Sequence, residues 1–200
     1  FFYIYFMFLG VFYLRYCYTF LFFIVSFFNC LHAQSIQLSS WPINQIEFAN
    51  TAINEEYLTL EEQKVFLILN LARINPKLFY TTILKSYQVP QGFSDDCLIN
   101  NRYINSLSKQ LRKMKSLGPL YPDRELWEYA QCHAFKSGKK GVVGHKRVGC
   151  AKPDLYAECC SYGFEKAIDI VIQLLIDYQV TDLGHRNIML NPKYKLLGVS

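Results

Sequence analysis

The most informative stretch of this sequence is Gly184-His185-Arg186-Asn187-Ile188-Met189-Leu190. Its glycine–histidine pair has a counterpart in Gly144-His145, although the whole chain contains only four histidines. Two acidic residues, Glu158 and Asp177, complete a set of groups that combine imidazole with carboxylate. Such a combination can hold a divalent cation or transfer a proton near neutral pH. His145, Glu158, Asp177 and His185 are therefore the candidate site residues.

The N-terminal segment predicts export. Residues 1–28 are almost wholly apolar and aromatic, and Arg15 is their only charged residue. A basic residue, an apolar run and a small residue at Ala33 are typical of a secretory signal, so we expect residues 1–33 to be removed and the protein to be extracellular. The alternative is a membrane anchor formed by residues 1–28, because about 20 apolar residues can span a bilayer.

Residues 34–200 are enough for one domain with a core of its own. The chain carries a net charge of +5. Basic residues gather around residues 102–115 and 136–147, which we interpret as a solvated surface with a mild preference for anionic partners. No nucleic-acid motif accompanies this charge, so the sequence predicts no nucleic-acid partner.

Cysteine usage also favours an exported protein. Outside the expected signal lie Cys97, Cys132, Cys150, Cys159 and Cys160, which permit two disulfides and one remaining thiol. Neighbouring side chains on a strand point to opposite faces. We therefore expect Cys159 and Cys160 to bond to different partners, with Cys132 and Cys150 as the nearest candidates.

Several helix boundaries can be predicted from capping residues. Thr59 with Glu62 forms a capping box, Asn75-Pro76 starts a second helix, and Asp123 caps a third, in which Phe135 is expected to face inward. Residues 34–57 show no sustained period and are expected to form a surface linker. Further helices are predicted over residues 104–117 and 165–178, with a helical turn over 185–190 and strands over 155–161 and 195–200.

Seven short motifs follow one another in a fixed order between residues 60 and 200. They are Asn70-Leu71-Ala72-Arg73, Asn75-Pro76, Ala130-Gln131-Cys132-His133, Gly144-His145, Ala157-Glu158, Gly184-His185-Arg186-Asn187-Ile188 and Leu197-Gly198-Val199. This ordered set resembles the CAP superfamily, the SCP domain of cysteine-rich secretory, antigen 5 and pathogenesis-related 1 proteins, and in particular its bacterial secreted members. The resemblance implies a domain over residues 58–200 with an α+β fold: a three-layer α-β-α sandwich around a small antiparallel sheet. The family's last strands are expected to be missing after Ser200.

The resemblance also implies a cleft with four polar residues. His145 and His185 match the family's two histidines, and Glu158 matches the glutamate of its Gly-Glu-Asn motif. Asp177 falls where the family often has a glutamate, but Leu174 replaces the tryptophan that usually precedes it. Cys159 replaces the asparagine after Glu158, so the amide is absent.

These residues support three functions. Family members are described as binding sterols, lipids or proteins, so the first hypothesis is a secreted binding module for such a ligand, with a divalent cation such as zinc held by His145 and His185. In it, Glu158 and Asp177 orient the rings or add ligands. The second is a metal-dependent hydrolase acting on peptide bonds, with Glu158 as general base. The third is a structural or toxin-like interaction protein in which the four residues are only a hydrogen-bonded network.

Two neighbouring residues are given a structural interpretation. His133 lies in a predicted helix, where a half-buried, hydrogen-bonded histidine is the usual outcome. Cys132 precedes it directly, and adjacent helical side chains diverge by about 100°, so the two cannot form a nucleophile–base pair. Cys132 is expected to be half of a disulfide or a buried thiol.

Overall fold

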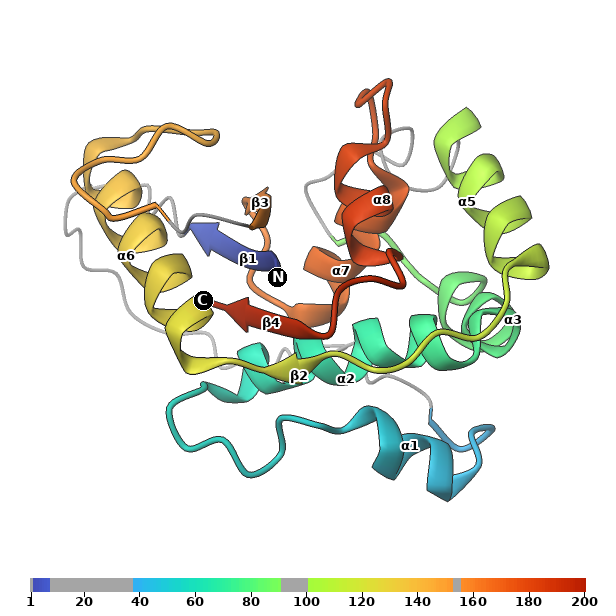
Figure 1. The fold of residues 1–200 in the computed structure, drawn as a ribbon. Coiled ribbons are helices and arrows are strands. Elements are labelled where there is room, and N and C mark those ends of the chain that lie inside the picture. The colour runs from blue at the N-terminus through green and yellow to red at the C-terminus, as the bar shows by residue number, and fades with distance from the viewer. Residues whose placement is uncertain (1, 8–37, 91–100, 153–155) are drawn as a thin grey trace, which may run out of the picture.

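The computed structural model describes residues 2–7, 38–90, 101–152 and 156–200, which form a mainly helical α/β structure around a small sheet (Figure 1). The helices are α1 (Ile43–Ala49), α2 (Leu60–Ile74), α3 (Pro76–Phe79), the π-helix η1 (Tyr80–Leu84), α5 (Arg102–Lys113), α6 (Arg124–Lys140), α7 (Ala167–Ile176) and α8 (Gly184–Met189). The strands are β1 (Phe2–Met7), β2 (Tyr121–Pro122), β3 (Ala157–Tyr162) and β4 (Leu196–Val199). None of the helices in these ranges is long and apolar enough to cross a bilayer. The expected cleavage point at Ala33 lies outside them.

The three predicted helix caps are confirmed. The hydroxyl of Thr59 accepts a hydrogen bond from the Glu62 backbone N–H at 3.3 Å, and the Glu62 carboxylate accepts one from the Thr59 N–H at 2.6 Å. Asn75 and Asp123 accept hydrogen bonds from the N–H groups three residues ahead of them, at 3.2 and 2.9 Å. These contacts satisfy donors that have no partner within the helix, and they fix where α2, α3 and α6 begin.

The sheet has the strand order β2-β4-β1-β3, and all three strand pairings are parallel. The resemblance implied an antiparallel sheet. The difference arises because β1 runs between β3 and β4 and pairs in the same direction with both, and because β2 also pairs in the same direction with β4 (Figure 1). β1 belongs to the segment expected to be removed as a signal. A chain cleaved after Ala33 would therefore lose the strand that joins β3 to β4.

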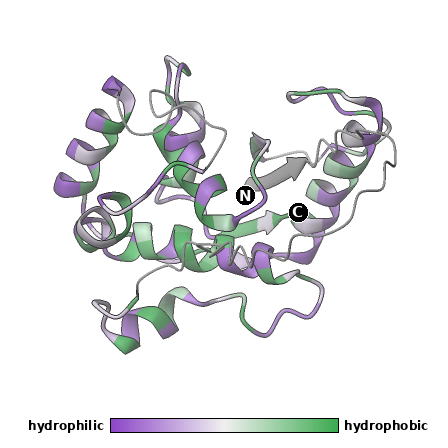
Figure 2. Cartoon of the chain, turned by 180° about the vertical axis from the view of Figure 1, so that it is seen from behind, coloured by the Kyte–Doolittle hydropathy of each residue, from purple (hydrophilic) through white to green (hydrophobic). Residues whose placement is uncertain are grey.

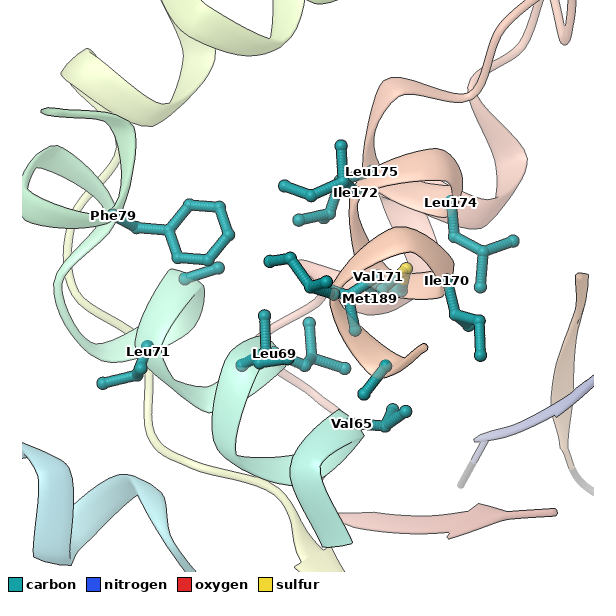
Figure 3. Close-up of a cluster of buried hydrophobic side chains, with 14 of the residues drawn as sticks. Val65, Leu69, Leu71, Phe79, Ile170, Val171, Ile172, Leu174, Leu175 and Met189 are labelled. Carbon is teal, nitrogen blue, oxygen red and sulfur yellow. The ribbon is translucent and has the colours of Figure 1, made fainter. Parts of the chain in front are cut away.

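The core lies between α2 and α7. Val65 and Leu69 of α2 face Val171 and Leu175 of α7, and all four are completely buried (Figure 3). α7 is buried on nearly every side because it packs against α2 on one side and against β3 and α8 on others. Figure 2 shows the hydrophobic residues of α2 and α7 concentrated at the centre of the molecule. A helix that is hydrophobic all round is typical of such a central position.

The segment expected to be a surface linker is part of the fold from residue 38 onward. It carries α1, which packs against α2, and its Trp41 and Ala49 are buried. The side-chain amide of Asn70 on α2 donates hydrogen bonds to the Ala49 and Leu120 carbonyls at 2.9 and 3.0 Å. Its oxygen accepts one from the Leu120 N–H at 2.7 Å. This tertiary anchor leaves no periodic pattern in the sequence.

α6 packs against the sheet through fewer residues than the sequence predicted. Its buried residues are Leu126, Ala130, His133 and Ser137, which recur every three or four positions. Phe135 is 62% exposed, so the expectation that it faces inward is wrong. Two residues correspond to about 200° around a helix, which places Phe135 almost opposite His133. On the buried side, a side chain at Gly198 of β4 would overlap main-chain atoms of α6, so only glycine allows this close approach.

Candidate functional site

The first histidine–carboxylate pair joins the loop after α6 to β3. His145 Nδ1 lies 2.6 Å from Glu158 Oε1, and Arg147 donates to Glu158 Oε2 at 2.8 Å. The side chain of Glu158 is only 4% exposed. A buried carboxylate is tolerated when it is paired and hydrogen-bonded, and both oxygens of Glu158 have such partners.

The second pair is formed where α7 ends and α8 begins. His185 Nδ1 lies 2.7 Å from Asp177 Oδ1, and the Arg186 backbone N–H donates to Asp177 Oδ2 at 3.2 Å. Asp177 follows the last residue of α7 in the left-handed conformation, with φ 58°. Aspartate is one of the few residues other than glycine that visit this region routinely. Asp177 therefore ends α7 and orients His185 at the same time.

The two pairs meet in space. The imidazole rings of His145 and His185 have centroids 6.4 Å apart and planes inclined by 33°. The side chain of His145 is 59% exposed and that of His185 is 22% exposed, so solvent reaches the site mainly from the His145 side. The structure thus brings together all four residues proposed from the sequence, including Asp177, whose match to the family motif is the weakest.

Arg186 holds the second histidine in place. Its guanidinium is buried and donates to the Leu175 and Ile176 carbonyls at the end of α7, at 2.6 and 2.7 Å, and to Ser106 Oγ of α5 at 2.7 Å. Burial lowers the pKa of Arg186, and the neighbouring carboxylate of Asp177 partly offsets this effect. Arg186 is not among the site residues proposed from the sequence. Its position directly after His185 is the one signal that would have suggested it.

A second group of potential ligands lies behind His145. One ligand atom each from His133, Glu158 and Cys160 falls within 4.8 Å of the others, and all three residues are buried. This group could hold a metal ion. His133 is hydrogen-bonded as expected, to the Gly144 carbonyl and the Ser137 hydroxyl, both at 3.1 Å, but it is fully rather than half buried. The group could not be proposed from the sequence, because Cys160 was expected to form a disulfide.

The cysteine pairing differs from the expectation. Cys132 of α6 and Cys150 of the following loop form a disulfide with each other, while Cys159 and Cys160 are free thiols. The prediction that Cys159 and Cys160 bond to these two residues is therefore wrong. The two thiols do point to opposite faces of β3, but each face is already packed: Cys159 lies in the main core and Cys160 beside Ala130. The remaining candidate, Cys97, lies outside the part of the chain that the structure describes.

A cavity of about 710 Å³ lies apart from the histidines, between the beginnings of α2 and α7 and the outer side of α6. Its lining is largely apolar around Phe135 and Ala134, with charged groups that include Glu61 and Lys139. None of the four histidine and carboxylate site residues lines it. The exposed Phe135 is therefore one wall of a hollow.

Comparison with known proteins found no matching protein-family model, no matching curated protein and no matching solved structure.

The pKa of His145 gives a testable pH dependence. Its hydrogen bond with Cys160 and then that with Glu158 raise this pKa from 6.5 to about 10. Because the folded-state pKa is raised, the contribution to stability is complete below the unfolded value of about 6.5 and is lost as the pH rises through about 10. We expect the melting-temperature difference between wild type and His145→Gln to be constant below pH 6.5 and to shrink above it.

Thermal denaturation over this pH range measures the difference, with Lys146→Gln as the control for loss of an adjacent, exposed positive charge. A difference that widens with rising pH, or that Lys146→Gln reproduces, would contradict the assignment.

Proposed function

We propose that this protein is an exported, CAP-type binding domain that holds a divalent cation between His145 and His185 and binds a sterol or another lipid. One observation carries the proposal: two imidazoles 6.4 Å apart, each with its Nδ1 against a buried carboxylate. The ordered motifs of residues 60–200 supply the link to the family. The apolar N-terminal segment supports export.

The fold proposed with this function is the family's α-β-α sandwich with an antiparallel sheet. Helices that pack against the small sheet support it (Figure 1). β3 and β4 run parallel to each other, and β1 occupies the strand position between them. A strand that occupied this position in the opposite direction would pair antiparallel with both β3 and β4. The placement of β3 and β4 is therefore compatible with the sheet of the family, whereas the parallel pairing of β2 with β4 would have to differ.

The residues present suit a cation. An imidazole whose Nδ1–H donates to a carboxylate has its lone pair on Nε2, and this arrangement is typical of histidines that bind metal ions. Zinc accepts nitrogen ligands of this kind together with water. The raised pKa of His145 means that the cation must displace a proton, so affinity should increase with pH.

Binding fits the geometry better than hydrolysis. A hydrolytic mechanism needs Glu158 as a general base with access to a water molecule. Both oxygens of Glu158 accept hydrogen bonds, from His145 and Arg147, and its side chain is 4% exposed. The carboxylate therefore acts as a partner for these two residues, which favours the binding module over the peptidase.

The cavity beside Phe135 is the proposed ligand site. Its volume of about 710 Å³ lies within the range of roughly 300–1,000 Å³ that is usual for small-molecule sites. A largely apolar lining that also contains charged side chains suits an amphipathic molecule such as a sterol. Because no residue is shared with the histidine pairs, ligand and cation should bind independently.

Zinc binding tests the first half of the proposal. We expect isothermal titration of the full chain to show a zinc site that His185→Gln weakens by at least about tenfold, and that Asp177→Asn weakens by about 10–100-fold because the orienting carboxylate is lost. Asp182→Asn is the matched control, since Asp182 is an exposed carboxylate in the same turn. Equal affinity in wild type and His185→Gln would refute the site.

Sterol uptake tests the second half. We expect a fluorescent sterol to bind the protein equally well before and after chelation of metal ions, and Phe135→Ser to reduce binding because it removes the aromatic wall. Phe48→Ser is the control, because Phe48 is 54% exposed on α1 and does not line the cavity. Uptake that disappears on chelation, or that ignores Phe135→Ser, would argue against this ligand site.

A further inference from the structure

Three buried side chains converge on the Nδ1 side of His145, away from the proposed cleft cation. Cys160 Sγ lies 3.8 Å from Glu158 Oε1, and His133 Nε2 lies 3.9 Å from the same oxygen. Cys160 Sγ is also 3.4 Å from His145 Nδ1. The exposed fractions of His133, Glu158 and Cys160 are 0%, 7% and 6%. A thiol, an imidazole and a carboxylate therefore face one another out of water.

Two of the three separations between ligand atoms are close to those of a tetrahedral zinc site, and the third, between the Cys160 sulfur and the His133 nitrogen, is within 4.8 Å. Zinc binds sulfur at about 2.3 Å and nitrogen or oxygen at about 2.0–2.2 Å, which places neighbouring ligand atoms about 3.3–3.7 Å apart. The observed 3.8 and 3.9 Å need to shrink by only a few tenths of an ångström. Thiolate with imidazole and carboxylate selects thiophilic ions such as zinc over magnesium or calcium.

We infer that Cys160 Sγ, His133 Nε2 and Glu158 Oε1 form a buried, thiolate-containing site for zinc, separate from the cation position between the two exposed histidines. Glu158 belongs to both sites, but Cys160 and His133 belong to the inner site alone and His185 to the cleft alone, so variants of these three residues distinguish the failure of one site from the failure of the other. The inner site ties α6 to β3, and its three protein ligands leave the fourth position of the zinc to water or another small ligand.

The surrounding groups can support this coordination. Arg147 holds Glu158 Oε2 at 2.8 Å, which fixes the carboxylate and directs Oε1 toward the other ligands. Ser137 Oγ lies 3.1 Å from His133 Nδ1 and can accept a hydrogen bond from a protonated Nδ1, which leaves the lone pair on Nε2. The Gly144 carbonyl then gives up its contact with His133, while the Tyr162 hydroxyl still lies 3.5 Å from it. Zinc binding releases the thiol proton of Cys160 to solvent.

Cobalt substitution tests the site directly, because a thiolate bound to Co²⁺ produces a charge-transfer absorption band that imidazole and carboxylate do not. We expect this band on adding Co²⁺ to the full chain with the Cys132–Cys150 disulfide intact, and its displacement by Zn²⁺. Cys160→Ser should abolish the band. Cys159→Ser is the matched control: it removes the adjacent thiol, which lies in the main core on the other face of β3. All variants keep the other cysteines, and circular dichroism checks that they fold.

His185→Gln separates this site from the proposed function. If it leaves the band unchanged, the inner site stands even where the cleft binds no cation. A band that survives in Cys160→Ser would overturn the inference, because another thiol would be the ligand. Cobalt binding without the band, or no binding at all, would also overturn it.

Discussion

The burial of two carboxylates is the constraint on which the site depends. The side chains of Glu158 and Asp177 are 4% and 1% exposed. An ionised carboxylate taken out of water is strongly unfavourable unless a charged or hydrogen-bonding partner comes with it. Their partners are His145 with Arg147, and His185 with the start of α8. The folded chain must therefore place His145 beside Glu158 of β3 and His185 beside Asp177 at the end of α7. With both carboxylates satisfied in this way, the two imidazole rings lie next to each other.

Two buried arginines extend the constraint to the rest of the molecule. Arg186 joins the end of α7 to α5, as described above. Arg73 on α2 donates to the Met189 and Asn191 carbonyls after α8, at 2.7 and 3.1 Å, and to the Gly118 carbonyl at 3.0 Å. Burial lowers the pKa of Arg73 to about 10. Both guanidiniums use backbone carbonyls as acceptors, so they fix the position of α8, and with it His185, relative to the core.

Local features of the fold could be predicted from the sequence, because their partners lie a few residues apart. The caps at Thr59, Asn75 and Asp123 are of this kind. The four site residues could be proposed from two glycine–histidine pairs and two acidic residues, whose order in the chain resembles that of the CAP superfamily. Contacts between distant segments could not. No local sequence feature indicates that Cys132 forms a disulfide with Cys150. The position of β1 likewise depends on the space between β3 and β4, which exists only in the folded chain.

The same limit explains why the inner group around Cys160 was not foreseen. Strand alternation correctly placed Cys159 and Cys160 on opposite faces, but the sequence could not show that the second face carries His133 of α6. Once these residues are adjacent, their chemistry favours coordination. His145 lies between the two proposed cation positions, with its Nδ1 toward the inner group. The orientation of the His145 ring therefore affects both proposed cation positions.

The central claim is that folding brings two imidazoles, each oriented by a buried carboxylate, into one site. Long-range ¹H–¹⁵N NMR spectra of the histidine rings during a zinc titration of the Cys160→Ser protein test it most directly, because the inner site is removed. The account predicts that the Nε2 signals of His145 and His185 change together and reach their end point at one equivalent, with Nδ1 of both rings protonated throughout. Signals that change separately, or a response from only one of the two rings, would contradict it.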